Sequence, residues 1–238
     1  KGNVIDPLVL IDSYSADALR FTLLSMASPG RDVKLSEQRV KGYRNFLTKI
    51  WNVNNFLKVN KCTFDGVIKP KNLKLNINKW IYNELIETKI LTENFIKNYR
   101  FDEAAKTIYK FVWNSYCDWY LEFLKPIFDS NDKKYINEAK AFSSLIMANI
   151  LKLLHPFIPF FTECIWQKNN YKTIYKMNLV SSDWPVHKPI THFKKNQVNI
   201  NDIIELISCI RSTKSELKIT PKLQCDLFFS EKSTSLQK

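Results

Sequence analysis

The sequence predicts an all-α protein, an antiparallel helix bundle with a small α+β extension at its C-terminal end. Three observations lead to this prediction. Only four glycines occur among the 238 residues, which is too few for the many tight turns of an all-β fold. Apolar residues recur at helical spacing through several long segments, most of which are separated by short connections. With 45% hydrophobic residues, a chain of this length can bury a core without a disulfide or a metal.

Two short helices are expected at the beginning of the chain. Pro7 follows Asp6, and this order is typical of a helix start, because aspartate caps free N–H groups and proline suits the first helical position. Ser15 is the expected cap of a second helix over 16–27, which the Pro-Gly pair after it ends.

A longer helix is predicted over 36–57, with Ser36 as its cap and a glutamate in its first turn. Its apolar positions repeat at helical spacing and comprise Val40, Tyr43, Leu47, Ile50, Trp51 and Leu57. The basic segment 58–75 is expected to be a loop.

Helical spacing also predicts helices over about 77–98, 102–124 and 134–154, the second capped by Asp102. The expected buried stripe of that second helix comprises Ala105, Ile108, Val112, Tyr116, Trp119 and Phe123. A His-Pro pair stops the third helix, because a residue before proline avoids helical geometry. A shorter helix is expected over 159–167.

The C-terminal quarter has weaker patterns. Residues 173–180 are expected to form a weak strand or an extended loop, and 183–195 a loop containing two prolines. A last amphipathic helix is predicted over 200–217. Residues 223–229 alternate between apolar and polar side chains, which predicts a strand. The helix and this strand make the α+β extension.

The net charge of +13 is the strongest indication of function. Such an excess favours a polyanionic partner, which could be nucleic acid, an anionic membrane or an acidic protein. No apolar run is long enough to span a membrane, and the chain does not begin with a signal-peptide pattern, so a cytoplasmic location is expected. The five cysteines are widely spaced and form no Cys-x-x-Cys pair, and we expect them to be reduced and structural.

No catalytic constellation is found in the sequence. Four dispersed glycines cannot build a phosphate-binding loop, and hydrolytic nucleophile motifs are missing. The three histidines have no partners at metal-binding spacing. We therefore expect no catalytic residue, no metal and no cofactor in this chain.

The side of the 36–57 helix opposite its apolar stripe is basic and polar. Between Lys34 and Lys61 the chain carries seven lysines and arginines against one acid, Glu37. Cationic side chains there could contact phosphates, asparagines could bind the edges of unpaired bases, and Phe56 could stack on a base. The alternative is a solvated face whose Phe56 packs into the end of the bundle, and composition alone favours neither interpretation.

Several segments, in order along the whole chain, match the motifs of one known family. Tyr14-x-x-Asp17-Ala18-Leu19-Arg20 is similar to a Tyr-Gly-Ala-Asp-Ala-Leu-Arg helix, with Ser15 in place of the glycine. The other matching segments are Lys1-Gly2-Asn3-Val4-Ile5-Asp6-Pro7, Ser28-Pro29-Gly30-Arg31-Asp32-Val33-Lys34-Leu35, Gly42-Tyr43-Arg44-Asn45-Phe46, Cys117-Asp118-Trp119-Tyr120-Leu121-Glu122 and Leu154-His155-Pro156-Phe157-Ile158-Pro159-Phe160. Together these segments resemble valyl-tRNA synthetase, a class I aminoacyl-tRNA synthetase family. Cys164 and Lys214 depart from the family pattern, which usually has a glutamate and an arginine there.

This resemblance implies a division of the chain into three parts. Residues 1–32 would connect the catalytic signature loop of the family to the bundle, 33–195 would be a helix bundle of the class I synthetase anticodon-binding type, and 196–238 would begin a small C-terminal domain. The catalytic domain would precede Lys1, so the parent enzyme would use ATP and magnesium while this fragment alone would be non-catalytic.

The resemblance also implies a partner and its contact residues. The bundle would bind the anticodon stem-loop of valine tRNA, and the protein would be a monomer. The residues expected to contact tRNA are Lys34, Arg39, Arg44, Asn45, Lys49, Asn52 and Phe56. Two alternatives remain, a helical scaffold that binds RNA or proteins non-specifically and the corresponding domain of an isoleucyl or leucyl relative.

Overall fold

The computed structural model describes residues 6–30, 32–64, 70–185, 194–226 and 228, and every regular element among them is helical. The all-α prediction is confirmed. Residues 1–5, the greater part of the expected loop over 183–195 and residue 229 lie outside the described residues. In the described ranges, no helix combines the length and the apolar character that crossing a membrane requires.

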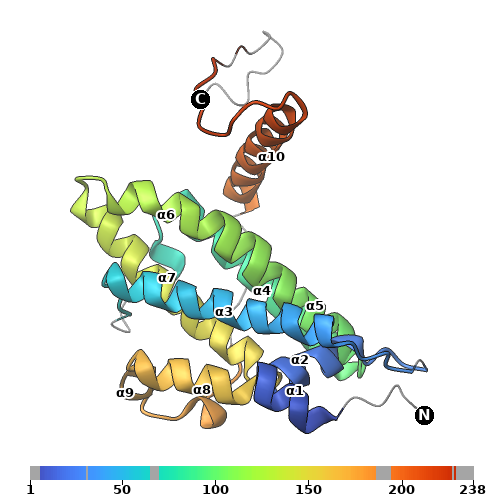
Figure 1. The fold of residues 1–238 in the computed structure, drawn as a ribbon. Helices are drawn as coiled ribbons and strands as arrows, with labels where there is room; N and C mark the ends of the chain where they lie inside the picture. Colours follow the sequence, from blue (N-terminus) through green and yellow to red (C-terminus); the bar gives the residue numbers. More distant parts are fainter. Residues whose placement is uncertain (1–5, 31, 65–69, 186–193, 227, 229–238) are drawn as a thin grey trace.

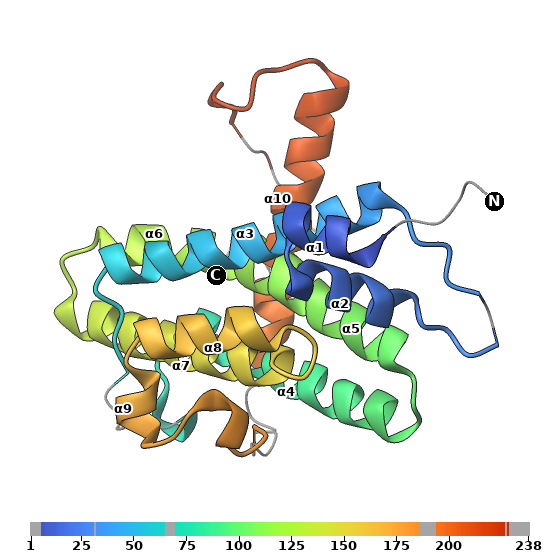
Figure 2. The same ribbon diagram turned by 60° about the horizontal axis from the view of Figure 1, so that its bottom comes forward.

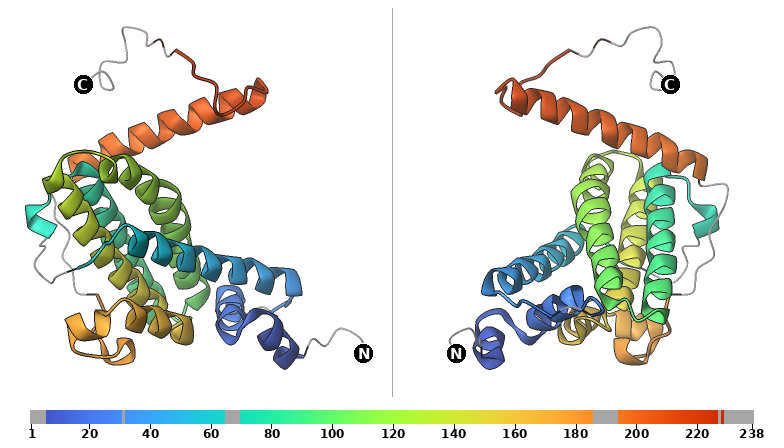
Figure 3. Two further views of the ribbon diagram at one scale, coloured as in Figure 1. Left: turned by 60° about the vertical axis from the view of Figure 1, so that its left-hand side comes forward. Right: turned by 90° about the vertical axis from the view of Figure 1, so that its right-hand side faces the viewer.

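Three antiparallel rods form the body of the molecule (Figures 1 and 3). The first is α4 (Asn76–Lys97). The second is one continuous helix, made of α5 (Phe101–Lys110), the π-helical stretch η2 (Phe111–Tyr120) and α6 (Leu121–Phe128). The third is α7 (Lys133–Leu154), and α3 (Glu37–Val59) packs across η2 and α7. This arrangement is the predicted antiparallel bundle.

The core between these helices is rich in aromatic side chains whose polar groups are satisfied. Trp80 and Tyr120 are fully buried, and the Tyr120 hydroxyl donates to Asn78 Oδ1 at 2.8 Å. The Tyr116 hydroxyl donates to the Ser143 carbonyl at 3.2 Å. Buried phenols with partners add packing area without leaving a polar group unpaired.

Helices α1 (Pro7–Tyr14) and α2 (Ala16–Met26) begin at the predicted residues. Asp6 accepts a hydrogen bond from the Leu8 N–H at 2.9 Å, and the Ser15 hydroxyl accepts one from the Ala18 N–H at 3.3 Å. Each bond satisfies one of the N–H groups left free at a helix start. The two caps are therefore confirmed.

Two polar contacts hold α2 against the turn between α7 and α8 (Pro159–Lys168). The buried carboxylate of Asp17 accepts a hydrogen bond from the Phe161 N–H at 2.6 Å. Arg20 donates to the carbonyls of Pro156 and Phe157, both at 3.3 Å. Residues expected only to connect the bundle to a preceding domain are thus packed onto it.

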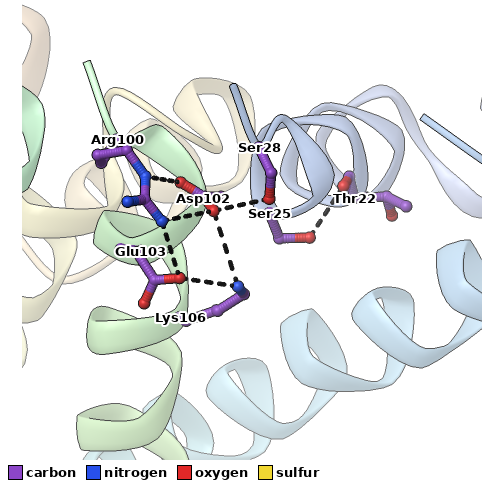
Figure 4. Close-up of polar contacts among 7 residues, drawn as sticks. All are labelled: Thr22, Ser25, Ser28, Arg100, Asp102, Glu103 and Lys106. Atoms are coloured by element: carbon purple, nitrogen blue, oxygen red, sulfur yellow. Dashed lines mark hydrogen bonds and ion pairs between the residues drawn. The ribbon is translucent and has the colours of Figure 1, made fainter. Parts of the chain in front are cut away.

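The prediction that Asp102 caps a helix is wrong. Helix α5 begins at Phe101, Arg100 occupies the N-cap position, and Asp102 lies inside the first turn. Its carboxylate, 1% exposed, instead accepts hydrogen bonds from Arg100 Nε at 3.1 Å and from Ser28 Oγ at 2.8 Å (Figure 4). These partners hold the pKa of Asp102 down at about 2 and tie the end of α2 to α5.

The expected regular helix over 102–124 is wrong in its second half. From Phe111 to Tyr120 the backbone is π-helical, and the helix continues past Pro126 to Phe128. The wider π turn shifts the buried side of the helix, so Tyr120, Leu121 and Leu124 are buried. Trp119 and Phe123, which regular α-helical spacing places in the core, are only half-buried.

The strand predictions of the C-terminal quarter are also not confirmed. Residues 173–180 contain the end of α9 (Tyr171–Tyr175) and the short 3-10 helix η3 (Leu179–Ser181). In 223–229, residues 223–226 and 228 are described, and none of them is in a strand. Leu223 is 55% and Phe228 93% exposed, so no other described residue covers them as a sheet would. Within the predicted loop over 58–75, Pro70–Asn72 forms the 3-10 helix η1, and 65–69 lie outside the described residues.

The last helix, α10 (Lys194–Glu216), begins earlier than predicted and projects from the bundle (Figures 1 and 3). Its N-terminal half packs against α4, where Ile200 is buried and Trp80 Nε1 donates to Asn201 Oδ1 at 2.9 Å. Farther along, the Arg211 guanidinium lies 5.0 Å from the centre of the Trp119 ring. The helix is thus anchored to the bundle at two places.

Several helices are followed by a non-glycine residue in the left-handed region of backbone conformation. Tyr99 allows the free-energy cost of this conformation to be tested. Tyr99 has φ 58° and follows α4 in a Schellman arrangement, in which the Arg100 N–H bonds to the Phe95 carbonyl at 2.8 Å. A side chain in this conformation costs about 1 kcal/mol that glycine avoids. We expect Tyr99→Gly to be about 1 kcal/mol more stable than Tyr99→Ala in urea unfolding. The alanine variant is the control, since both lose the ring contact with Phe101, and equal stabilities would contradict the prediction.

Candidate nucleic-acid interface

A groove between α3 and the facing helix, formed by η2 and α6, is lined by four of the seven residues predicted to contact RNA. Asn45, Lys49, Asn52 and Phe56 line one wall of a hollow of about 530 Å³. The other wall is formed by side chains of η2 and α6, namely Cys117, Leu121, Glu122 and Lys125. We call this hollow the α3–α6 groove. Asn45 and Asn52 are exposed, and no hydrogen bond to another described residue occupies their side-chain amides.

The other three predicted residues lie elsewhere. Arg44 lines a different hollow, between α2, α3 and α8, where its Nη1 donates to Thr48 Oγ1 at 2.8 Å. Arg39 precedes Asn45 by six residues, so the two side chains leave the helix about 120° apart. Lys34 is exposed in the segment before α3. The groove lining therefore contains four of the seven predicted residues, and the other three lie outside it.

Lys49 is not a free cation. Its Nζ pairs with Asp118 Oδ1 at 2.5 Å and lies 4.1 Å from the centre of the Trp113 ring. Both partners belong to η2, which follows Lys49 by more than 60 positions in the sequence. The pair compensates the charge of Lys49 locally and joins α3 to η2.

Phe56 packs against the bundle. Its ring is half-buried and stacks on Phe128, with 6.1 Å between the ring centres. The packing alternative weighed for Phe56 therefore describes this side chain better than a free stacking platform does. Only the part of the ring that lines the groove is left for a ligand.

Most cations of α3 have no acidic partner. Among the described residues, no carboxylate lies within ion-pair distance of Lys41, Arg44, Lys58 or Lys61. Glu37, the one acid of this region, instead accepts a hydrogen bond from the Tyr14 hydroxyl at 2.7 Å, which raises the pKa of that phenol. The helix thus presents uncompensated positive charge, which attracts a polyanion.

Sequence reasoning missed the second wall of the groove. Glu122 and Lys125 pair with each other at 2.6 Å on α6 and stand opposite the asparagines of α3. Nothing in the local pattern of either helix indicates that they face each other, because the contact depends on how α3 packs across η2. In the described part of the chain, no group of His, Cys, Asp or Glu is placed to hold a metal ion.

Comparison with known proteins places the bundle in a family. Residues 78–229 match the family described as the anticodon-binding domain of tRNA ligase. A valine–tRNA ligase of Pelagibacter ubique is 52% identical over an alignment that covers 100% of this chain and 28% of that protein. A valine–tRNA ligase of Bartonella quintana is 44% identical, over 92% of this chain and 24% of that protein. The chain thus spans about a quarter of the length of these relatives.

A solved structure shares the fold. It is a ternary complex of LeuRS, tRNA and LeuAMS from Agrobacterium radiobacter K84, which aligns with a TM-score of 0.57 over 78% of this chain and 22% of that one. The two sequences are 18% identical, so the similarity establishes a common architecture and nothing about which residues bind RNA.

Proposed function

We propose, from the fact that this chain belongs to the family of anticodon-binding domains of tRNA ligases, that it is the tRNA-binding part of a valine–tRNA ligase. It would hold the anticodon stem-loop of valine tRNA in the cytoplasm, as a monomer. ATP-dependent charging of that tRNA, with its magnesium, would be performed by other parts of the longer enzyme. The identities of 52% and 44% to valine–tRNA ligases over nearly the whole chain support the valine assignment.

The observation that carries this proposal is the α3–α6 groove. Asn45 and Asn52 are exposed there, and an asparagine amide offers both a donor and an acceptor to the edge of an unpaired base. Cations without acidic partners lie on the same helix and would hold the phosphates of the strand. Base contacts and phosphate contacts together are what reading an anticodon requires.

The test compares the chain's affinity for valine tRNA with its affinity for the same tRNA carrying a different anticodon. We expect tighter binding of the natural tRNA, and we expect the double variant Asn45→Ala, Asn52→Ala to reduce this preference about 10- to 30-fold, since each amide hydrogen bond contributes about 1 kcal/mol. Asn55→Ala is the matched control, because Asn55 is exposed on α3 but does not line the groove. Equal affinities of the unaltered chain for the two tRNAs would refute anticodon reading and leave a non-specific RNA scaffold.

A further inference from the structure

A second hollow lies where α3 and α8 both end, and it is lined by lysines. Its volume is about 420 Å³, and its walls include Lys58 from the end of α3, Lys61 from the turn that follows α3 and Lys168 from the end of α8. Thr63 and Asn170 add polar groups from the segments that follow these helices. Figure 2 shows the end of α3 on the same side of the molecule as α8 and α9. We call this hollow the lysine pocket.

The lysines of this pocket are uncompensated. Among the described residues, no acidic side chain lines the hollow and no carboxylate pairs with Lys58, Lys61 or Lys168. Lys168 lies 4.6 Å from the centre of the Trp51 ring, which holds its ammonium group by a cation–π contact. Lys58 and Lys61 thus bring two like charges to the lining of the hollow, and Lys168 adds a third whose ammonium group lies over Trp51, beside the hollow; like charges repel one another unless an anion joins them.

Stabilisation of the helix C-termini would be one reason for these lysines, but it does not account for them. Cations gather at helix C-termini because the last carbonyls carry partial negative charge. The carbonyls at the end of α3 already have partners, since the Lys61 N–H bonds to Lys58 O and the Cys62 N–H to Leu57 O, each at 2.9 Å. At the end of α8, the Asn169 N–H bonds to Ile165 O at 3.0 Å. None of the three ammonium groups donates to these carbonyls.

Left-handed backbone conformations occur on both sides of the pocket. Lys61 has φ 54° and Asn170 has φ 57°, so two non-glycine residues that line the same hollow are held in the left-handed region. This conformation strains the lysine, whereas asparagine adopts it more readily, and strained residues gather at binding sites. Glycine would adopt the left-handed conformation with less strain at either position, but it would remove a side chain that lines the pocket.

We propose that the lysine pocket is a phosphate-binding site that holds a backbone phosphate of the RNA bound in the α3–α6 groove. The proposal rests on the proposed function, because the groove supplies the bases of the same strand. Lys58 lies six residues beyond Asn52, which is about 9 Å along the axis of α3 and about 120° around it, so the bound strand would turn around the end of α3 between the groove and the pocket. The pocket would thus fix the position of the strand whose bases the groove reads.

The experiment removes the three charges and measures tRNA binding as a function of salt. In the triple variant Lys58→Gln, Lys61→Gln, Lys168→Gln we expect about tenfold weaker binding of valine tRNA at moderate salt. The slope of log affinity against log salt should become shallower by about 0.7 to 0.9, the change that one lost phosphate contact produces. The preference for the natural anticodon should stay unchanged, because phosphate contacts position a strand and do not read bases.

The matched control removes the same charge elsewhere. Lys97, Lys110 and Lys222 are exposed and lie outside the lysine pocket, so their triple glutamine variant loses three charges without touching the site. If the two triple variants bind valine tRNA equally while the unaltered chain keeps its anticodon preference, the pocket proposal is wrong and the proposed function stands. If the pocket variant alone weakens binding but the unaltered chain shows no anticodon preference, the pocket is upheld and anticodon reading is not.

A second arm separates RNA phosphate from free phosphate. Titration with inorganic phosphate, followed by the backbone amide signals of Thr63 and Asn170, should give weak binding that the pocket variant abolishes. Phosphate binding at these residues, combined with an unchanged affinity of the pocket variant for tRNA, would identify a site for free phosphate and overturn the RNA assignment.

Discussion

Replacement of Asp102 by asparagine is expected to lower the free energy of unfolding by about 2 to 3 kcal/mol at pH 7. The side chain is 1% exposed and its carboxylate accepts hydrogen bonds from Arg100 and Ser28. These bonds hold its pKa at about 2, against an ordinary value of 3.8. Because each pKa unit corresponds to about 1.4 kcal/mol, the chain with Asp102 ionised has a free energy of unfolding about 2.5 kcal/mol larger than the chain with Asp102 protonated. Asparagine preserves the shape but loses the charge.

The same pKa gives a pH dependence with a definite sign. A carboxyl group whose pKa is lowered by folding contributes its full stability above the pKa of the unfolded state, near 4, and loses it as the pH falls towards about 2. The difference between the unaltered chain and Asp102→Asn should therefore be largest at pH 5 to 7 and nearly vanish at about pH 2. Urea unfolding across this range measures it.

The control for this prediction is the neighbouring acid. Glu103 is 35% exposed and contacts the same arginine at 3.4 Å (Figure 4). An exposed ion pair contributes less than about 1 kcal/mol, so Glu103→Gln should have a small effect. Equal effects of the two substitutions at pH 7 would mean that the buried carboxylate of Asp102 contributes no more to stability than an exposed ion pair does.

The sequence could predict helix caps that depend on local hydrogen bonds, but not the role of Asp102, which depends on a long-range one. Asp6 and Ser15 cap helices through bonds to residues two and three positions away, and such local patterns are visible in a sequence. The bond from Ser28 to Asp102 spans 74 positions, so the same residue type that suggests a cap is used here for a tertiary contact. The period of apolar residues likewise located the bundle helices but could not indicate the π-helical stretch, which changes the period itself.

The candidate site was predictable to the extent that it lies on one helix. Asn45 and Asn52 are placed by the helical period of α3, and the structure brings both to one groove. The pairing of Lys49 with Asp118 spans 69 positions and depends on the packing of α3 across η2. The lysine pocket combines the ends of two helices that are distant in sequence. Charge counting along the chain therefore found the basic region but not the hollows in it.

Ser15 occupies a backbone conformation that is essentially reserved for glycine. Its φ is 92° and its ψ is 150°, a region in which a side chain costs about 1 to 3 kcal/mol. The residue ends α1, where its N–H bonds to the Ile11 carbonyl at 2.8 Å, and begins α2 at the next position. The geometry thus gives a physical reason for the glycine that the resembling family has at this position. The serine hydroxyl offsets part of the cost by capping α2.

Ser15→Gly is therefore expected to raise the free energy of unfolding by about 1 kcal/mol. Two costs oppose the relief of the strained backbone. Exchanging serine for glycine at an N-cap costs only a few tenths of a kcal/mol, and glycine also adds conformational entropy to the unfolded chain. The relief of strain exceeds both costs together. Ser15→Ala keeps the strain and loses the cap, so it should be about 1 kcal/mol less stable than the unaltered chain. Thermal unfolding should show the two variants shifted in opposite directions, each by about 2 to 4 °C. A shift of both variants in the same direction would mean that the hydroxyl, and not the backbone, decides the stability of this junction.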